Sequence, residues 1–587
     1  MIVSAFAEVI SLGAVLPFLG VLTAPDKLFE KPWVHSLSNS WNISSSDQLV
    51  LWMTVLFAFA ALFAGGIRIF LLWVSTRLAF SSGADLSIEV YKRTLYQPYS
   101  VHVSRNSSKI LSGIVEKVSN SVSVLYQALT LMSSIVLLVA ITAALIAINP
   151  TVSLSALFGF GLCYGVISVK YRRQLRANSH CISEMQTEVI KALQEGLGGI
   201  RDILLDGTQP VYCEIYKRAD QPLRWARGNN LFIGGSPRFA MEALGMVMIA
   251  ALAYQLTRAG GMNTALPLLG ALALGAQRLL PALQQAYSAW VSIVGNYSSL
   301  KDTVELLEQP IPKEMLLPPP APLRLLKTIR FEHIHFRYRS DGPWVINDLN
   351  LTVAKGTRVG FVGTTGSGKS TVLDLMMGLL TPTQGKLLID DQPISGTGED
   401  EVRRRTWQRA VAHVPQQIYL TDASLAENIA FGVPKDLIDF EKVRQAARQA
   451  QIAEFIESQP EAYSSFVGER GIRLSGGQRQ RIGIARALYK QASVLVFDEA
   501  TSALDNATED SVMEAIRGLN PELTIFLIAH RLTTVRGCDL IVELADGRIK
   551  AQGTYQQLLD ISPSFRRMAQ LDPAQTLTGS LASGEPN

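Results

Sequence analysis

The residues most able to do chemistry form a glycine-rich run, Gly363-Thr-Thr-Gly-Ser-Gly-Lys-Ser370, in the second half of this 587-residue chain. The run follows a short β-like stretch, Arg358–Val362, and opens a helical pattern. Glycines at this spacing let backbone N–H groups curl around the phosphates of a nucleotide, which is the arrangement called a P-loop. Lys369 is expected to reach the β- and γ-phosphates, and Ser370 to bind Mg²⁺. The predicted nucleotide contacts of this run are Gly363, Thr364, Thr365, Gly366, Ser367, Gly368, Lys369, Ser370 and Thr371.

A second run, Val494–Asp498, is apolar, resembles a β-strand and is followed by Glu499, so it ends in two adjacent carboxylates. Asp498 is predicted to hold Mg²⁺, as an acid at the end of such a strand does in P-loop enzymes. Glu499 would then lie beside the γ-phosphate and act as the general base for the attacking water. An apolar strand ending in Asp-Glu is weak evidence alone, but together with a P-loop it predicts ATP hydrolysis.

The run Leu474-Ser-Gly-Gly-Gln478 resembles the signature sequence of ABC ATPases, which other P-loop enzymes lack. Just before it, Val467-Gly-Glu-Arg-Gly471 is similar to the segment found there in exporter-type members of that family. The resemblance covers essentially the whole chain, because exporter-type members fuse six membrane spans to this ATPase.

This resemblance implies further site residues. Tyr338 matches the aromatic residue that stacks on adenine, Gln416 the Q-loop glutamine and His530 the switch histidine that holds the γ-phosphate. Gln416 is assigned a role in catalysis. It is also predicted to bind Mg²⁺, together with Ser370 and Asp498. Ser502–Asp505 matches the D-loop. The nucleotide contacts that the resemblance adds are Tyr338, Ser475, Gly476, Gly477, Gln478 and Asp505.

The signature also carries an expectation about assembly. In that family two ATPase domains pack head to tail, so that the P-loop of one faces the signature of the other. Ser475 and Gly477 would then contact the γ-phosphate of the ATP held by a second copy. A signature serine and glycines at a helix start form an anion site. One exporter-type subunit has a single such pair, so the resemblance implies a homodimer that uses ATP and Mg²⁺.

The elements before the ATPase are apolar. Long apolar runs fill the first 300 residues and are absent from the rest. A bilayer core requires about 20 apolar residues per helix. Met1–Leu22 could also be a cleaved signal peptide, but it lacks a basic start and Glu8 interrupts it. The family begins with a cytoplasmic segment, so either the true start lies upstream or this first helix is short. The six predicted spans are Met1–Leu22, Leu49–Trp73, Val122–Ile148, Val152–Val169, Ala240–Leu256 and Thr264–Leu283.

Charge sets the predicted orientation. Basic residues cluster in two long connections, Leu86–Asn120 and Arg172–Ala226, which the positive-inside rule assigns to the cytoplasm. Both are too long for plain turns, so we expect the helices to continue into the cytosol and to end in short transverse segments near Gln97–Val103 and Asp206–Tyr216. The ATPase is then cytoplasmic, and the protein is expected in a bacterial inner membrane as a multi-pass protein.

A proline-rich run, Leu317–Pro322, marks the boundary between the two parts, because such a run is stiff and non-helical. After it the chain alternates β-rich and helical patterns, which indicates an α/β domain. The predicted fold is an α-helical transmembrane domain (six spans, extended cytosolic helices) fused to an α/β P-loop ABC ATPase domain. We assign residues 1–308 to the transmembrane domain, 309–327 to the linker, 328–571 to the ATPase and 572–587 to a disordered tail.

Composition excludes some classes of function. The net charge of +4 is mild and gives no basic face for nucleic acid. The four cysteines form no CxxC pair and no metal-ligand spacing, which favours reduced thiols over disulfides or a metal site. They are Cys163, Cys181, Cys213 and Cys538.

Three arginines, Arg68, Arg238 and Arg278, lie within or against the apolar spans, where a charge is costly. At about 1.5 Å per residue all three fall in the inner half of the core. In a dimer they would place six guanidiniums around an inward-facing cavity, and guanidinium suits bidentate phosphate binding. The alternative is that Arg68 and Arg238 snorkel to the inner interface, with Glu242 as a partner of Arg238. Substrate binding by these arginines is the favoured hypothesis.

Two segments, Ser236–Gly245 and Gln277–Pro281, look like the corresponding segments of bacterial lipid-linked oligosaccharide flippases. That resemblance implies a cargo in the inner leaflet: a polyprenyl-pyrophosphate-linked oligosaccharide or a similar glycolipid, flipped to the outer leaflet. The outer loop Lys27–Leu37 would form an external helix on the lipid tail, or a plain interfacial anchor. One alternative is an exporter of another amphiphile, such as a lipid A-like lipid, a drug or a peptide. A non-transport ABC ATPase acting on nucleic acid is remote, because spans are fused and no basic face is present.

Overall fold

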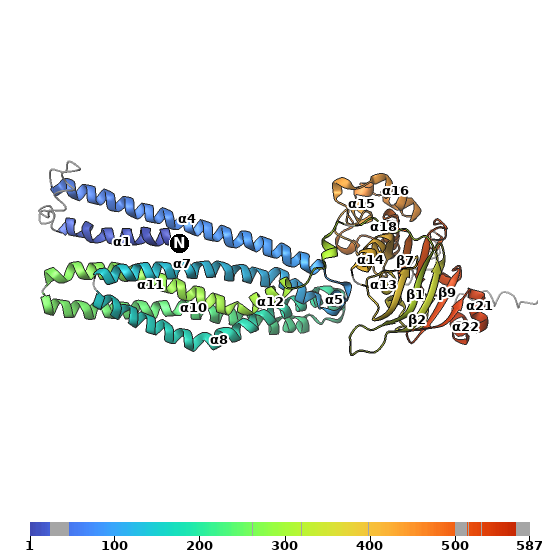
Figure 1. The fold of residues 1–587 in the computed structure, drawn as a ribbon, viewed down its shortest axis with the longest axis horizontal. Helices are drawn as coiled ribbons and strands as arrows, with labels where there is room; N and C mark the ends of the chain where they lie inside the picture. Colours follow the sequence, from blue (N-terminus) through green and yellow to red (C-terminus); the bar gives the residue numbers. More distant parts are fainter. Residues whose placement is uncertain are drawn as a thin grey trace, which may run out of the picture. The chain divides into compact units, whose positions relative to one another are not determined.

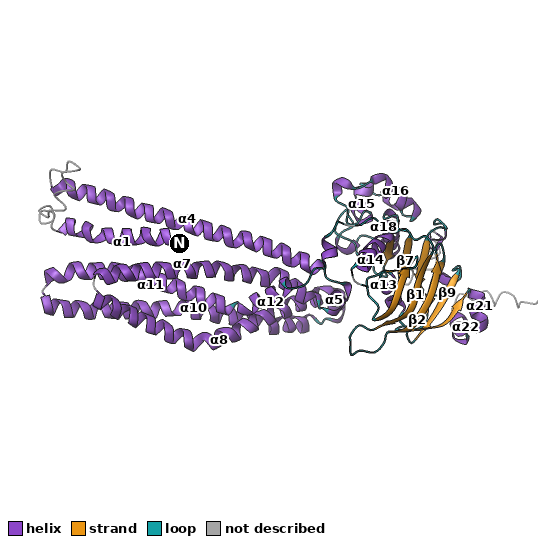
Figure 2. Ribbon diagram, viewed as in Figure 1, coloured by secondary structure: helices purple, strands orange, loops and turns teal. Residues whose placement is uncertain are grey.

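The computed structural model describes residues 1–23, 46–148, 150–260, 262–318, 320–396, 398–498, 513–514, 516–529 and 531–570. The chain divides into two compact units. The first comprises Met1–Gln97 and Ser104–Pro310, and the second comprises Pro98–Val103 and Ile311–Asn587. Helices make up the first unit, whereas the second combines helices with strands (Figure 2). The predicted outer loop Lys27–Leu37 and the predicted tail 572–587 lie outside the described residues.

Long helices lie side by side in the first unit (Figure 1). Two of its segments, Val50–Leu95 and Ser107–Ala147, are long and apolar enough to cross a membrane among the residues described. Each of the six predicted spans falls in a separate helix, although the number of membrane crossings stays a prediction. The helices of this unit are α1 (Ile2–Thr23), α4 (Ser46–Leu95), α6 (Ser107–Ser112), the π-helical turn η1 (Gly113–Lys117), α7 (Val118–Ile148), α8 (Pro150–Gly198), α9 (Ile200–Asp206), α10 (Gln209–Gly260), α11 (Met262–Gly295) and α12 (Tyr297–Leu307). Helix α5 (Tyr99–Ser104) lies between α4 and α6 in the sequence, but all of it except Ser104 belongs to the second unit.

Short helices interrupt the long ones near both predicted transverse segments. Helix α5 (Tyr99–Ser104) lies where Gln97–Val103 was predicted. The second prediction, Asp206–Tyr216, was wrong: the short helix is α9 (Ile200–Asp206), and α10 already begins at Gln209. Glycines explain the shift, because α8 ends at Gly198 and Gly207 closes α9 with φ of 63°, a conformation that favours glycine.

A charge pair joins α1 to α4. The Arg68 guanidinium lies 3.0 Å from the Glu8 carboxylate, and the Glu8 side chain is only 2% exposed. A lone carboxylate in an apolar helix would be costly, so the arginine on the neighbouring helix offsets that cost. Glu8, which interrupts the apolar N-terminal run, therefore has a structural role within the helix bundle.

Polar side chains also connect η1, α8 and α12. The Lys117 ammonium of η1 lies 2.6 Å from the Asp302 carboxylate, to which the Ser183 hydroxyl of α8 donates at 2.5 Å. Burial acts to raise the pKa of Asp302, but the hydrogen bonds from Lys117 and Ser183 outweigh it, so the pKa is lowered. Gly113 lies close by, and a Cβ there would come within 2.7 Å of the Leu306 side-chain methyl, so that side chain packs directly against the glycine.

Replacing Asp302 with Asn is expected to destabilise this junction. The Lys117 side chain is 6% exposed, so losing the carboxylate leaves a buried ammonium without its counter-charge. Because Asp302 is itself partly exposed, we expect a cost of about 1–3 kcal/mol, below the full value for a buried pair. Thermal inactivation of ATP hydrolysis in detergent should occur several degrees lower. The neighbouring exposed lysine offers a matched control, and Lys301→Gln should leave the inactivation temperature unchanged.

The second unit is built on two sheets. One has four antiparallel strands in the order β2-β1-β4-β5, and the other has six in the order β10-β9-β3-β8-β7-β6. In the six-stranded sheet, neighbouring strands from β9 to β6 are parallel. The strands are β1 (Thr328–Phe336), β2 (Ile346–Ala354), β3 (Arg358–Val362), β4 (Gln384–Ile389), β5 (Gln392–Pro393), β6 (Val411–Val414), β7 (Val494–Asp498), β8 (Thr524–Ile528), β9 (Leu540–Ala545) and β10 (Arg548–Gly553).

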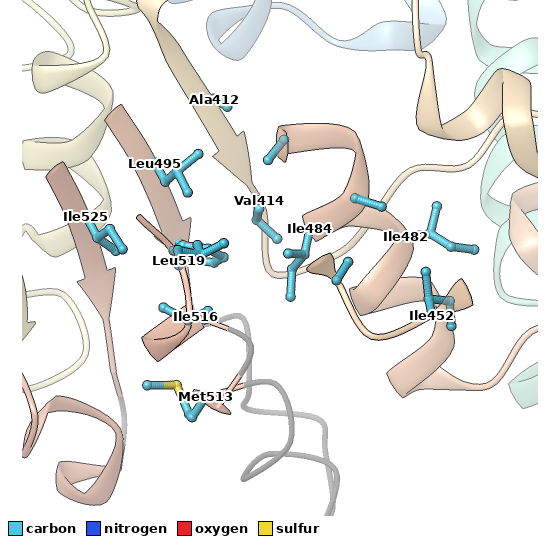
Figure 3. Close-up of a cluster of buried hydrophobic side chains, with 14 of the residues drawn as sticks. Ala412, Val414, Ile452, Ile482, Ile484, Leu495, Met513, Ile516, Leu519 and Ile525 are labelled. Atoms are coloured by element: carbon cyan, nitrogen blue, oxygen red, sulfur yellow. The ribbon is translucent and has the colours of Figure 1, made fainter. Parts of the chain in front are cut away.

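Helices surround these sheets, and the apolar strands supply the core. A buried cluster joins Leu495 and Ile525 of the sheet to Ile482 and Ile484 of α18 (Figure 3). Runs that are apolar at every position are typical of parallel strands covered on both faces. The helices of this unit are η2 (Lys313–Leu316), α13 (Lys369–Met376), α14 (Glu399–Ala410), α15 (Leu425–Ile429), η3 (Lys435–Leu437), α16 (Phe440–Gln449), α17 (Ala453–Glu457), η4 (Ala462–Ser464), η5 (Glu469–Gly471), α18 (Gly476–Tyr489), α20 (Leu532–Val535), α21 (Tyr555–Ile561) and α22 (Pro563–Gln570).

Candidate nucleotide-binding site

The glycine-rich run forms a loop between β3 and α13. Gly363 has φ of 146°, and a Cβ there would lie 2.2 Å from the Leu544 carbonyl oxygen. Gly368 has φ of 100° and ends the loop as the residue that precedes α13. Only glycine fits at Gly363, because both the backbone angle and the space exclude a side chain. The strand–loop–helix arrangement predicted for a P-loop is therefore present.

Lys369 lies inside this loop. Its side-chain ammonium donates to the carbonyl oxygens of Gly363 at 2.9 Å and Thr364 at 3.0 Å, and the residue is 6% exposed. The hydroxyl of Ser367 is buried and has no hydrogen-bond partner among the described residues. A buried positive charge and an unsatisfied hydroxyl inside a glycine loop suit the phosphate chain of a nucleotide, which would satisfy both.

Strand register brings the predicted Mg²⁺ ligands to one edge of the sheet. Phe361 of β3 and Asp498 of β7 both pair with Ile528, so they flank that residue from opposite sides. Since neighbouring strands lie about 4.8 Å apart, Phe361 and Asp498 are about 10 Å apart across the sheet, and the P-loop begins two residues after Phe361. Gln416 follows β6, whose Val414 pairs with Phe497. The carboxyl ends of these strands therefore gather the P-loop, Asp498 and Gln416 together.

A second acidic residue, Asp374, lies at the same edge and was not found from the sequence. It is on α13, four residues after Ser370, and is therefore on the same helix face. Burial and the nearby Asp498 carboxylate raise the pKa of Asp374 to about 6. The sequence did contain a signal for this residue. Asp374 is the one charged residue in the otherwise apolar run Val372–Leu380, and a carboxylate in a run that is buried indicates a functional position.

Tyr338 follows β1 and is 50% exposed. Its ring meets Phe336 edge to face at 5.0 Å, and its hydroxyl lies 3.2 Å from the Thr371 hydroxyl of α13. The contact with α13 holds the ring near the P-loop while much of its surface stays open. This geometry suits the predicted stacking on adenine.

Replacing Tyr338 with Ala is expected to raise the KM for ATP about tenfold, because base–aromatic stacking contributes about 1–3 kcal/mol per base. The kcat should change little, since stacking binds the ground state and the transition state equally. Steady-state ATP hydrolysis measures both constants. Tyr338→Phe keeps the ring and should keep the KM, whereas a KM unchanged in the alanine variant would remove Tyr338 from the site.

The signature residues begin helix α18. Ser475 precedes its first residue; its hydroxyl accepts a hydrogen bond from the Gln478 N–H at 3.2 Å, and its own backbone N–H donates to the Gln478 side-chain oxygen at 2.8 Å. This reciprocal capping fixes the first turn. Ser475 and Gly476 are exposed, and a Cβ at Gly476 would meet no atom within 4 Å. The start of a 14-residue helix is thus open to an outside ligand.

Three predicted site residues, Glu499, Asp505 and His530, lie outside the described residues. For the intramembrane arginines the outcome is mixed. Arg68 forms the pair with Glu8 described above, and Arg238 donates to the Glu242 carboxylate at 2.7 Å, as the alternative hypothesis expected. The side chain of Arg278 lies outside the description, although its backbone is in α11. Both described arginines therefore have carboxylate partners.

Known proteins resemble this chain along most of its length. Residues 346–502 match the family described as ABC transporter, and residues 5–264 match the ABC transporter transmembrane region. An ATP-dependent lipid A-core flippase of Chromohalobacter salexigens is 33% identical over 421 residues, which cover 70% of this chain and 69% of the relative. The Legionella pneumophila protein of the same name is 28% identical over 484 residues, which cover 82% of this chain and 80% of that relative.

Among solved structures, this chain is similar to a bacterial Atm1-family ABC exporter with ATP bound. The matched region covers 99% of this chain and 98% of the exporter chain. The TM-score is 0.74 at 23% sequence identity, so this likeness concerns the fold alone. The predicted fusion of a helical membrane region to an ABC ATPase is confirmed. The chain is therefore a member of the ABC transporter family, an exporter whose transmembrane region is fused to the ATPase that drives transport.

Proposed function

We propose that two copies of this chain form a homodimer in a bacterial inner membrane and use ATP to move a phosphorylated, lipid A-like glycolipid from the inner to the outer leaflet. The observation that carries this proposal is the similarity, over 70% of the chain, to a protein named as an ATP-dependent lipid A-core flippase. A multi-pass topology with a cytoplasmic ATPase is part of the proposal, because the positive-inside rule assigns the two basic connections to the cytoplasm.

Within each ATP site the residues have separate tasks. Lys369 and the P-loop amides hold the phosphates, and Tyr338 stacks on the base. An oxygen donor set made of the Ser370 hydroxyl, the Asp498 carboxylate and the Gln416 amide suits a hard cation such as Mg²⁺. When bound, Mg²⁺ neutralises charge on the β- and γ-phosphates. Glu499 would take the proton of the attacking water, and His530 would hold the γ-phosphate.

The open start of α18 supports the proposed homodimer. Each chain has one P-loop and one signature, and Ser475 with Gly476 faces solvent in the single chain. A second copy packed head to tail would bring its bound ATP to this helix start. Its γ-phosphate would then meet backbone N–H groups at the positive end of the helix dipole. ATP would close the two ATPase units, and hydrolysis would release them.

Closure needs a path to the membrane helices. The segment Pro98–Val103 belongs to the same compact unit as the ATPase, although α4 before it belongs to the helical unit. Movement of the ATPase would therefore pull on the end of α4. The second short helix, α9, exposes Leu204 and Leu205 at 61% and 77%, which is expected for a segment that a partner covers.

The proposed identity of the cargo rests on the names of the relatives more than on the three arginines predicted to lie in the membrane. Because these relatives are named lipid A-core flippases, they favour a lipid A-like amphiphile as the cargo. Transport of a polyprenyl-pyrophosphate-linked oligosaccharide, the cargo first predicted from the sequence, stays a prediction. Substrate binding by Arg68, Arg238 and Arg278 also stays a prediction. The carboxylates on Arg68 and Arg238 weaken it, because each already neutralises a guanidinium that the phosphate would need.

Flipping can be measured with purified protein in proteoliposomes. Fluorescent lipid A-core, a polyprenyl-pyrophosphate-linked glycan and a cationic drug would be supplied in separate preparations with Mg·ATP. The proposal expects ATP-dependent translocation and stimulated ATP hydrolysis with lipid A-core. Transport of the polyprenyl-linked glycan instead would restore the first hypothesis, and transport of the drug alone would overturn both.

A further inference from the structure

Two places at which the chain leaves the helical unit lie side by side. The helical unit comprises Met1–Gln97 and Ser104–Pro310, so the chain passes into the second unit after Gln97 and again after Pro310. The Gln97 side-chain amide donates to the Pro310 carbonyl oxygen at 3.1 Å, although the two residues are 213 positions apart. The last residue of the helical unit before one exit is therefore bonded to the last residue before the other.

Arg93, one helical turn before Gln97, strengthens this contact. One nitrogen of its guanidinium donates to the Leu307 carbonyl oxygen at 2.5 Å and to the Gln309 carbonyl oxygen at 3.0 Å. Its Nε donates to the Glu89 carboxylate of the same helix at 2.7 Å, which fixes the direction of the guanidinium. Bonds from a charged donor are stronger than neutral ones. We call these bonds from Arg93 and Gln97 to residues 307–310 the α4–linker contact.

The end of α12 requires a partner of this kind. Helix α12 ends at Leu307, where the Glu308 N–H still bonds to the Val304 carbonyl oxygen at 2.8 Å. The last four carbonyl groups of a helix have no partner within it, and the negative end of the helix dipole favours a cation. The next turn cannot supply donors, because Pro310 has no N–H. The Arg93 guanidinium supplies them instead.

An apolar layer beneath the contact holds the same helices together. Val90 of α4 is fully buried in a cluster with Val118, and Leu306 and Leu307 of α12 pack against it. Apolar packing is not directional, whereas hydrogen bonds to backbone groups fix one position. Removing the Arg93 side chain should therefore leave α4 and α12 packed but free to shift along each other.

The residues after the contact are stiff. The chain continues as Pro310-Ile-Pro312 and then as the proline-rich run Leu317–Pro322. A proline-rich segment is extended and passes a displacement along instead of absorbing it. A movement of the ATPase that pulls on Ile311 therefore reaches Pro310. The α4–linker contact then passes it to α4, where fraying of the last turn of α12 would otherwise absorb it.

We propose that Arg93, together with Gln97, makes the ends of α4 and α12 move as one body, so that ATPase closure is passed to the membrane helices without loss. Arg93 is a positioning residue, since it contacts backbone carbonyl groups and has no role in holding ATP or cargo. The inference rests on the proposed function, because it assigns the route by which closure reaches α4.

Hydrogen exchange of the dimer in nanodiscs tests this route without any cargo. Exchange is measured by mass spectrometry in the free state and after trapping with Mg·ATP and vanadate. In the natural protein, trapping should change exchange in the ATPase and along α4. In Arg93→Ala the ATPase should change as before, but α4 should not. The Glu308 amide of the free variant should exchange about tenfold faster, because bonds from a charged group are lost at that helix end.

Transport per ATP gives the functional measurement. In proteoliposomes, Arg93→Ala should hydrolyse ATP at the natural rate without cargo. The amount of lipid A moved per ATP hydrolysed should fall about tenfold, the loss expected when bonds from one charged group no longer hold the contact. A parallel fall in hydrolysis and transport, with the yield per ATP unchanged, would indicate a general structural role and would overturn the inference.

A neighbouring lysine provides the matched control. Lys92 lies one residue earlier on α4, and its ammonium is 3.8 Å from the same Glu89 carboxylate. Among the described residues it makes no bond to α12, so Lys92→Ala should keep the natural yield per ATP. Arg93→Lys should restore much of the yield, because an ammonium near a helix end also donates to its last carbonyl groups. Equal losses in Lys92→Ala and Arg93→Ala would mean that charge alone matters, which would overturn the inference.

The outcomes separate this inference from the proposed function. If the natural protein moves lipid A and Arg93→Ala moves it with the same yield per ATP, the α4–linker contact is not the route and the function stands. If the natural protein does not move lipid A, the proposed cargo fails, and the exchange experiment still decides the route. Trapping that changes α4 equally in the natural protein and in Arg93→Ala, or in neither, would overturn the inference.

Discussion

ATP hydrolysis by the Lys369→Ala variant is expected to fall at least about 100-fold, the usual loss when one preorganised charge partner of a transition state is removed. The Lys369 ammonium is held inside the P-loop by the carbonyl oxygens of Gly363 and Thr364, so it is already aimed at the phosphate chain. Alanine leaves the loop folded but removes its only positive charge. Phosphate release from the purified protein, with and without lipid A, measures the effect.

A matched lysine separates this loss from a general effect of charge. Lys386 of β4 is exposed and lies outside the loop, so Lys386→Ala should hydrolyse ATP at the natural rate. The Lys369→Ala variant should also lose affinity for ATP, because the interaction with the β- and γ-phosphates exists before the transition state is reached. A variant at Lys369 that hydrolyses ATP normally would refute the assignment of the P-loop.

The Glu499→Gln variant is expected to bind ATP normally and to hydrolyse it about 100- to 10,000-fold more slowly, which is the usual contribution of a general base. Glutamine keeps the shape of the side chain but cannot take the proton of the attacking water. Binding of a fluorescent ATP analogue and single-turnover hydrolysis measure the two steps separately. The ATP-bound dimer should accumulate, since closure no longer ends in hydrolysis.

A surface glutamate provides the comparison for this variant. Glu454 of α17 is exposed, and Glu454→Gln should leave both binding and turnover unchanged. The two predictions also differ in a useful way, because Lys369→Ala weakens binding and Glu499→Gln does not. Normal turnover by Glu499→Gln in detergent would mean that another group activates the water, and Asp374 would then be the first residue to examine.

The ATPase could be predicted closely from the sequence because its motifs require particular backbone shapes. Gly363 and Gly368 need angles that only glycine adopts readily, so their spacing already implies the loop. The apolar run Val494–Asp498 is buried on both faces in the sheet, as such runs are in parallel strands. Here the local chemistry of a short segment decides its structure.

The helical unit was harder to predict in detail. Long apolar runs indicated helices, but the break at Gly198 and the left-handed Gly207 decided where the second short helix lies, and periodicity does not locate such breaks. The carboxylate partner of Arg68 is Glu8, sixty residues away, which only the packing of α1 against α4 reveals. Packing of α8 against α11 likewise brings together the rings of Tyr164 and Tyr287, which are more than one hundred positions apart.

The measurement that tests the shared ATP site most directly compares nanodiscs that contain one copy of the chain with nanodiscs that contain two. The account predicts ATP hydrolysis at the full rate per chain in the two-copy discs and about 1% or less in the one-copy discs, because the latter lack both the signature of the partner and the charge stabilisation it supplies. Equal rates per chain in the two preparations would contradict it.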